Sequence, residues 1–401
     1  MKHTWKFKAR FRRRGFGWRS QPAVQRVREA VAEIRGVARK DPVLGGEGAV
    51  ALLERLSPAL EQVDSSSGAI GSAVHAAIGE LAALIGAAPA PAAVREDWIE
   101  RLWQAFNDDE IPYLESLGER WGEICGSAER ASSWAEEQLW ITTQALSPDP
   151  DMRSYYRGAV ACLSALHRAG RFAELLEVVE RDPRSLWHYR SWGMRALIGM
   201  GRKAEAIQFA EASRGKWTND LAVDRACEEV LLSSGLADEA YQRYGVRAAR
   251  GGTFLATFRA LAKRYPGKAA GELLRDLVAS TPGEEGKWFA AAKEAGLYDE
   301  ALALASRSPT DPKTLTRAAR DHVKERPEFA LGAGLAALRW LAHGYGYEVT
   351  GADVWSAWAN TLDAARVVGR EDAVRSEVRA LVEADASRFM AKVIGREVGL
   401  T

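Results

Sequence analysis

"GLYDEALALA" at residues 296–305 and "GLADEAYQRY" at residues 235–244 are two versions of one short pattern. The same frame recurs as "GRFAELLEVV" from Gly170 and as "GRKAEAIQFA" from Gly201. The glycines stand 31, 34 and 61 residues apart (170 to 201, 201 to 235, 235 to 296), and the last step is close to two units. The chain therefore contains an internal repeat with a period slightly above thirty residues.

The residues around each glycine predict a helical hairpin. A glycine just beyond a helix can adopt the left-handed conformation that ends it. The fourth residue after each glycine is a glutamate, which the dipole at the start of the next helix favours, and the residue after it is alanine or leucine, so that two helices can approach closely. An apolar residue stands four positions before each glycine. The three sets are Glu174, Glu205, Glu239 and Glu300; Leu175, Ala206, Ala240 and Ala301; and Leu166, Leu197, Leu231 and Ala292.

One hairpin of this size cannot bury its own apolar face, so its copies must stack on one another. The expected fold is therefore all-α, a right-handed α-solenoid of stacked helical hairpins over residues 153–401. Blurred copies are expected around Gly267, Pro327 and Gly369. An N-terminal helical domain at residues 20–147 and a basic aromatic arm at residues 1–19 precede this array.

The heart of the unit, Gly-Leu-Tyr-Asp-Glu-Ala-Leu at residues 296–302, resembles the middle of a tetratricopeptide repeat. A second stretch, "VDSSSGAIG" at residues 63–71, is similar to one in uncharacterised bacterial helical-repeat proteins, and that resemblance implies no activity. The first resemblance implies a concave groove lined by the first helix of each hairpin. The positions that it assigns to the groove are mostly cationic: Arg157, His167, His188, Arg195, Arg225, Glu229 and Lys293. They favour an acidic peptide or a peptide C-terminus as the partner, or else they are simply solvated helix faces.

Helical patterns also fill the N-terminal domain. The sequence predicts helices at about 20–38, 46–63, 69–86, 92–106, 111–124 and 127–145, the second of them broken or restarted at Ser57-Pro58. The helix at 69–86 carries Ile70, Val74 and Ile78 on one apolar face but also His75 and Glu80, so we expect a core helix rather than a membrane span. "SPDPD" at residues 147–151 predicts a seam before the array.

The first 40 residues hold 13 basic and 2 acidic side chains, although the whole chain is nearly neutral, with 55 Lys and Arg against 54 Asp and Glu. From Trp5 to Arg12 the cationic residues alternate with Trp5, Phe7, Ala9 and Phe11, so an extended arm would have an aromatic face and a cationic, phosphate-binding face. The candidate nucleic-acid contacts are Trp5, Lys6, Phe7, Lys8, Arg10, Phe11, Arg12, Arg13, Arg14, Trp18 and Arg19. Two alternatives remain: the arm packs on the protein's own acidic surface with its aromatic rings buried, or it serves an anionic membrane or a targeting system.

No catalytic, cofactor or metal site is predicted. "PGEEGKW" at residues 282–288 has only two residues between its glycines, where a phosphate loop needs four, and reads as a helix start. The six histidines are scattered, the three cysteines lie far apart, and "NDDE" at residues 107–110 is better explained as a helix cap than as a cation site. We therefore expect a non-enzymatic, cytoplasmic interaction scaffold that binds a protein or peptide, with nucleic-acid binding through the arm as the alternative and an unfamiliar enzyme as a third hypothesis.

Overall fold

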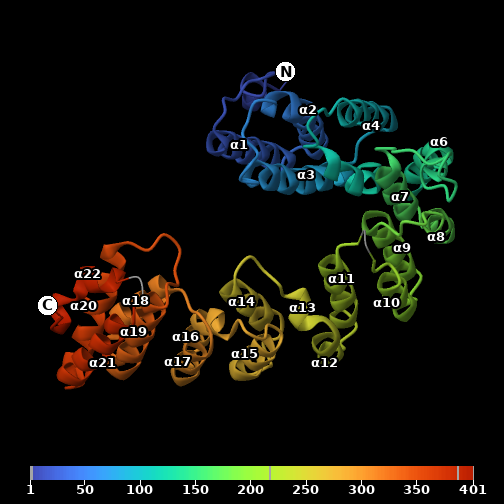
Figure 1. Ribbon diagram of the computed structural model, residues 1–401. Helices are drawn as coiled ribbons and strands as arrows, with labels where there is room; N and C mark the ends of the chain where they lie inside the picture. The colour runs from blue at the N-terminus through green and yellow to red at the C-terminus, as the bar shows by residue number, and fades with distance from the viewer. Residues whose placement is uncertain (1–2, 216–217, 386–387, 401) are drawn as a thin grey trace. The chain divides into compact units, whose positions relative to one another are not determined.

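The computed structural model describes residues 3–215, 218–385 and 388–400, and every regular element within these ranges is helical (Figure 1). The predicted all-α class is therefore confirmed. The chain divides into two compact units, Met1–Val223 and Asp224–Thr401, and the boundary falls inside helix α11 (Asp220–Leu232).

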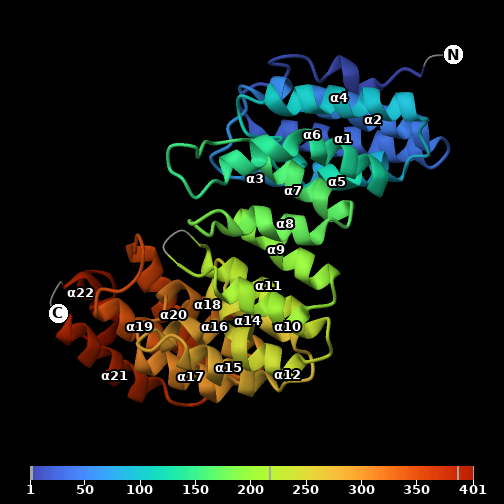
Figure 2. The same cartoon turned by 90° about the vertical axis from the view of Figure 1, so that its right-hand side faces the viewer.

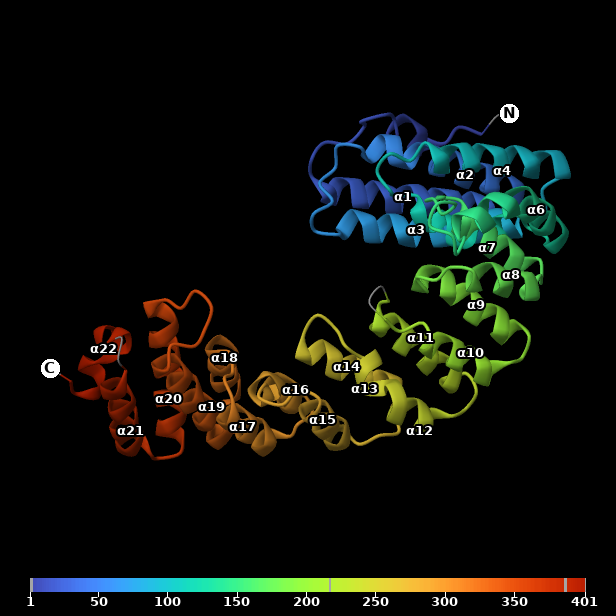
Figure 3. The same ribbon diagram turned by 45° about the vertical axis from the view of Figure 1, so that its right-hand side comes forward.

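The first unit begins with a short 3₁₀ helix and continues with long helices that become shorter along the chain. Its elements are η1 (Lys6–Ala9), α1 (Ser20–Ala38), α2 (Pro42–Leu60), α3 (Ala69–Ala87), α4 (Ala92–Asn107), η2 (Glu115–Arg120), α5 (Trp121–Ile124), α6 (Ala128–Ala145), α7 (Ala159–Arg168), α8 (Phe172–Glu180), α9 (Trp187–Gly199) and α10 (Lys203–Glu211). Helices α1, α2 and α3 pack on one another, and α4 packs on α2 (Figure 3). Helices α7 to α10 then follow one another as a series of neighbours (Figure 2).

The helix predicted at 20–38 is confirmed by α1, and the helices predicted at 92–106 and 127–145 are confirmed by α4 and α6. The predicted break at Ser57-Pro58 is wrong, because α2 runs unbroken through Pro58. Pro58 lies in the last turn of α2, where its missing N–H removes only one intrahelical hydrogen bond. The carbonyl of Pro58 accepts a hydrogen bond from the backbone N–H of Arg14 at 2.9 Å, so the end of the helix is also held by the N-terminal segment.

Among the described residues, α3 is the one helix long and apolar enough to cross a membrane, by length and composition alone. The face predicted to enter the core is buried, and it packs against α1 and α2. Gly68, in the left-handed conformation at φ 69°, forms the turn that precedes this helix.

The second unit consists of helices joined by short turns. Its elements are α12 (Ala237–Ala240), the π-helical turn η3 (Tyr241–Gly245), α13 (Val246–Ala248), α14 (Phe254–Arg264), α15 (Ala270–Ala279), η4 (Glu285–Trp288), α16 (Phe289–Glu294), α17 (Tyr298–Arg307), α18 (Pro312–His322), α19 (Pro327–Ala342), α20 (Gly351–Val367), α21 (Glu371–Ala384), α22 (Phe389–Ile394) and η5 (Arg396–Val398). The pairs α14/α15, α16/α17, α18/α19 and α20/α21 each pack together, and contacts also join α14 to α16, α17 to α19, α18 to α20 and α19 to α21. The blurred copies of the repeat therefore form helix pairs as well.

The hairpin turns have the conformation that the repeat predicted. Gly170, Gly201, Gly235 and Gly296 all have φ between 73° and 78°. In each turn the backbone N–H of the residue after the glycine donates a hydrogen bond to the carbonyl of the apolar residue that stands four positions before the glycine. In the turn at Gly296, for example, the Leu297 N–H donates to the Ala292 carbonyl at 3.0 Å. This is the six-to-one bond that closes a Schellman motif. The small residues that follow the glutamates are fully buried where the next helix begins, which confirms their packing role.

Candidate functional site

The groove residues predicted in the first unit are mostly occupied by internal contacts. The guanidinium of Arg157 donates to the carbonyls of Phe106 and Asp109, both at 2.8 Å. His167 lies near the rings of Phe172 and Trp192, and burial lowers its pKa. Arg195 lies over the Trp192 ring, 4.3 Å from its centroid. Three of these four side chains thus pack against the protein, and only His188 borders a cavity that the structure leaves open.

In the second unit, Arg225 and Glu229 line a cavity of about 700 Å³ between α11 and α14. Arg225 donates to the carbonyls of Ala248 and Arg250 at 3.0 and 2.9 Å, and Glu229 accepts from Arg264 at 2.5 Å. The third predicted residue of this unit, Lys293, is half-buried on α16 and does not line that cavity.

A buried carboxylate forms one wall of the cavity in the second unit. Glu228 accepts a hydrogen bond from the Tyr265 hydroxyl at 2.6 Å and forms an ion pair with Arg264 at 2.8 Å. Burial raises the pKa of Glu228 above its ordinary value. Apart from the exposed Lys263, the charged groups here are paired with one another or with backbone carbonyls, so this cavity is largely satisfied from within.

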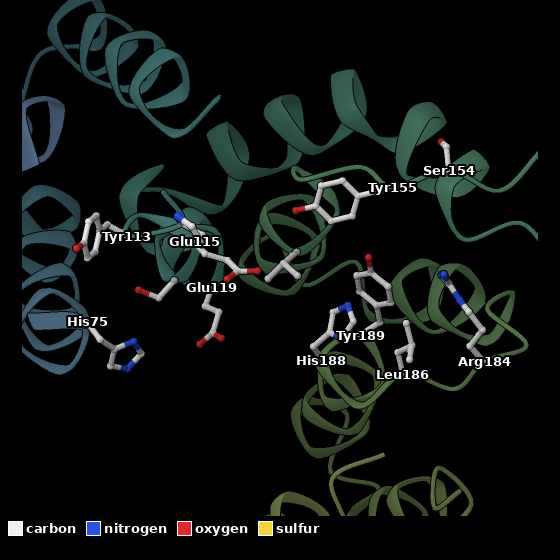
Figure 4. A pocket seen from close by; sticks show the side chains of 14 residues that line it. His75, Tyr113, Glu115, Glu119, Ser154, Tyr155, Arg184, Leu186, His188 and Tyr189 are labelled. Atoms are coloured by element: carbon white, nitrogen blue, oxygen red, sulfur yellow. The ribbon is translucent and has the colours of Figure 1, made fainter. Parts of the chain in front are cut away.

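The first unit contains a cavity of about 660 Å³ whose polar groups are not satisfied in this way (Figure 4). Helix α3, the segment before η2, η2 itself, the segment before α7, and the start of α9 all contribute to its wall. The lining residues are Gly71, His75, Pro112, Tyr113, Glu115, Ser116, Glu119, Ser154, Tyr155, Val160, Arg184, Leu186, His188 and Tyr189. We call it the unit-1 cavity.

The local sequence explains why two carboxylates reach this cavity. Leu114, Leu117 and Trp121 are buried, so the intervening Glu115 and Glu119 point outward from η2. The element is anchored to α7 by one hydroxyl: Ser164 Oγ donates to the Glu119 carbonyl at 3.1 Å and accepts from the Gly122 N–H at 3.0 Å. The position of both glutamates is therefore set by packing below them.

A second anchor holds the chain just before η2. The Asp109 carboxylate accepts from the Leu114 N–H at 2.7 Å, and Asp109 is itself buried. The helix predicted at 111–124 is thus only partly correct, because residues 111–114 form an irregular turn and helical structure starts at Glu115. The "NDDE" stretch contributes a carboxylate that fixes this turn. Among the residues described, no three His, Cys, Asp or Glu side chains gather as they would around a metal ion.

The unit-1 cavity carries negative charge. Within the described ranges, Glu115 and Glu119 make no side-chain hydrogen bond or ion pair. Arg184, the one cation of the wall that is charged at every relevant pH, is paired with the buried Asp182 at 2.7 Å. Loss of hydration lowers the pKa of His188, which keeps its ring neutral near pH 7.

Two tyrosine hydroxyls, those of Tyr155 and Tyr189, also border the unit-1 cavity. Tyr189 is only 7% exposed, whereas Tyr155 is 79% exposed at the rim. Neither hydroxyl has a hydrogen-bond partner within the described residues, and burial raises the pKa of Tyr189. Figure 4 shows Glu115 and Glu119 between the side formed by His75 and Tyr113 and the side formed by Tyr155, His188 and Tyr189.

The N-terminal arm does not have the predicted extended conformation, because Lys6–Ala9 form the 3₁₀ helix η1. Trp5, Phe7 and Phe11 are buried in the core of the first unit. Where they lie, these rings cannot stack on bases, since burial against the protein removes their apolar surface from water. Of the predicted aromatic contacts, only Trp18 is open to solvent, at 72% exposure.

Several cations of the arm form ion pairs with an acidic residue of α1 or with Glu61, which directly follows α2. Arg10 pairs with Glu29 at 2.8 Å, and Arg14 and Arg13 pair with Glu61 at 2.8 and 3.5 Å. The backbone N–H groups of Lys6 and Phe7 donate to the Glu33 carboxylate. The cations of the arm that make no side-chain ion pair within the described ranges are Lys6, Lys8, Arg12 and Arg19.

Sequence reasoning singled out only His188 among the residues that form the unit-1 cavity. Tyr113, Glu115, Glu119, Tyr155 and Tyr189 come from three separate segments, and no spacing rule joins them. The chain matches no protein-family model, and no curated protein shows significant similarity to it.

Proposed function

We propose that the protein is a non-enzymatic interaction scaffold, an array of tetratricopeptide-like hairpins in a right-handed superhelix, which binds a peptide segment of a partner protein. Support for the array comes from the repeated Schellman turns and from the contacts that join α14 to α16, α17 to α19, α18 to α20 and α19 to α21. Stacked hairpins with a concave face are suited to extended ligands.

The observation that carries the binding proposal is the unit-1 cavity. Its volume of about 660 Å³ falls in the range that ligand pockets occupy, roughly 300–1,000 Å³. Two carboxylates and two tyrosine hydroxyls border it without partners in the described part of the chain. A peptide could satisfy these groups with its side chains and its backbone, which a fully paired surface would not allow.

The test is a selection of a displayed random dodecapeptide library on the full-length protein. Gly71 lines the cavity, and a Cβ at this position would meet no atom within 4 Å, so Gly71→Trp can place an indole at the cavity wall and obstruct it. Gly36→Trp is the matched control, because Gly36 is an exposed α1 residue with equally open surroundings outside the cavity. We expect selected peptides to bind the Gly36→Trp variant and to lose binding to Gly71→Trp. A library that yields no specific binder, or binders that Gly71→Trp retains, would refute the proposal.

The second candidate function is nucleic-acid binding by the arm, which the unpaired Lys6, Lys8, Arg12 and Arg19 favour. It would act through phosphates and through Trp18, without base stacking by Trp5, Phe7 or Phe11. Replacing Lys6, Lys8 and Arg12 by Gln should then weaken a gel shift and flatten its dependence on salt. An unchanged salt dependence would remove this candidate.

A further inference from the structure

We propose that the unit-1 cavity recognises a basic side chain of the partner segment, arginine in preference to lysine. This inference rests on the peptide-binding function proposed above and names the chemistry of its ligand. It also differs from the acidic partner predicted from the helix faces, because Arg157 and Arg225 donate to carbonyls of their own chain and Glu229 pairs with Arg264.

The charge of the cavity wall favours a cation. Glu115 and Glu119 lie four residues apart on η2 and are both exposed to the cavity, and neither has an ion-pair partner in the described ranges. Arg184 adds no net attraction for an anion, since Asp182 lies 2.7 Å away and is almost completely buried. Among the residues that line the cavity, a cation would meet two carboxylates and no unpaired arginine or lysine, although Arg195, outside this lining, also attracts Glu119.

Tyr189 also indicates a ligand, independently of the carboxylates. Its side chain is more than nine-tenths buried, it lines the cavity, and its hydroxyl has no partner in the described part of the chain. The Tyr189 hydroxyl opens into the cavity and is not itself a buried unsatisfied atom, so a peptide backbone or guanidinium that enters the cavity can accept or donate a hydrogen bond there. Figure 4 shows this hydroxyl directed toward the space below Tyr155.

The exposed ring of Tyr155 favours arginine over lysine. Tyr155, which is 79% exposed at the rim of the cavity, offers ring surface, and a planar guanidinium can stack on a ring while it donates to a carboxylate in bidentate geometry. The ammonium of lysine is a point charge that gains less from this arrangement. The cavity is also larger than one side chain, so residues on either side of the arginine would enter with it.

The experiment uses the peptides selected on the full-length protein, synthesised in three forms with arginine, lysine or citrulline at the basic position. Citrulline keeps the shape of arginine but removes its charge. We expect the arginine form to bind on the order of tenfold more tightly than the citrulline form, because hydrogen bonds to charged groups are the stronger ones. We expect the lysine form to fall between them.

The charge of the cavity is tested with Glu115→Gln/Glu119→Gln, which keeps the shape of the wall. Its matched control is Glu137→Gln/Glu177→Gln, two exposed glutamates of the first unit outside the cavity. The difference between the arginine and citrulline forms should shrink to about twofold on the first variant and stay on the order of tenfold on the second. Circular dichroism and the urea midpoint establish that each variant is folded.

Two results would overturn the inference: selected peptides that compete at the cavity but carry no basic residue, or an arginine preference that Glu115→Gln/Glu119→Gln leaves intact. In both cases peptides still bind and are lost on Gly71→Trp, so the proposed function survives. Failure of the proposed function is a different result, because no peptide would then depend on Gly71.

Discussion

Replacing Phe11 by alanine tests whether the basic arm is part of the folded core. The Phe11 ring is 1% exposed and makes edge-to-face contacts with Phe7 and Phe16, at centroid distances of 6.2 and 5.1 Å. A buried phenylalanine removes about 150 Å² or more from water, which at ~25 cal/mol per Å² corresponds to roughly 4 kcal/mol. This agrees with the range of about 3–5 kcal/mol found for Phe→Ala changes in cores.

The assay is urea unfolding followed by circular dichroism, with hydrogen exchange of α1 and α2 to locate the loss in the first unit. Trp18→Ala is the control in the same segment, because Trp18 is 72% exposed and its loss should change stability by no more than about 0.5 kcal/mol. If Phe11→Ala and Trp18→Ala destabilise the protein equally, the arm is not packed as described, and its rings are available to a ligand.

Three further predictions concern packing and titration. Gly48→Ala should destabilise the protein by about 1–3 kcal/mol in urea unfolding, because the new Cβ would collide with the Trp5 ring. Gly36→Ala, in open surroundings on α1, should instead stabilise the protein by up to about 1 kcal/mol. Equal effects of the two substitutions would contradict this prediction. Burial raises the pKa of Glu228 in the folded protein above its ordinary value of 4.5, so the folded state binds this proton more tightly than the unfolded state does. The free energy of unfolding therefore has its full contribution from Glu228 below about pH 4.5 and loses it as the pH rises through the folded pKa. Because glutamine does not titrate, the difference in urea midpoint between Glu228→Gln and wild type should shift in favour of the variant as the pH rises from 4 to 7. A difference that stays constant over this range would refute the prediction. Burial raises the pKa of Cys125 to about 12 and of Cys162 to about 11, so both thiols should react with iodoacetamide far more slowly in the native protein than in urea. If peptide mass spectrometry finds equal alkylation rates in the native protein and in urea, the thiols are accessible and the prediction is wrong.

The hairpin turns were predictable because their causes are local. A left-handed glycine, an apolar residue four positions earlier and a glutamate in the next first turn all lie within ten residues, so the sequence alone contains the interaction that they form. The same holds for α1, whose boundaries follow from its period and its proline near the start. The uninterrupted α2 was not predicted, because the pattern does not show that Pro58 falls in the last turn, where the helix loses only one hydrogen bond; the bond from Arg14 that holds the Pro58 carbonyl joins residues far apart in the chain.

The arm shows how a local pattern can be assigned to the wrong environment. Alternation of aromatic and cationic residues is the pattern of an extended two-faced strand, but it also fits a short turn that packs one set of rings inward. The deciding contact is distant: Trp5 lies directly against Gly48 of α2, where any side chain larger than hydrogen would collide with the indole. The requirement for glycine at position 48 is explained only by its contact with Trp5, and the sequence does not show that these two residues are neighbours.

The groove residues failed as a guide to the partner for a related reason. A position on a helix predicts the direction of a side chain but not whether the fold already supplies its partner. Arg157 and Arg225 are cationic at groove positions, yet carbonyl groups of their own chain take up their donors. Glu115 and Glu119 drew no attention in the sequence, yet they keep their charge available. A ligand responds to the charges that remain unpaired after folding, so the sign of a binding surface follows from those residues and not from the total charge of a helix face.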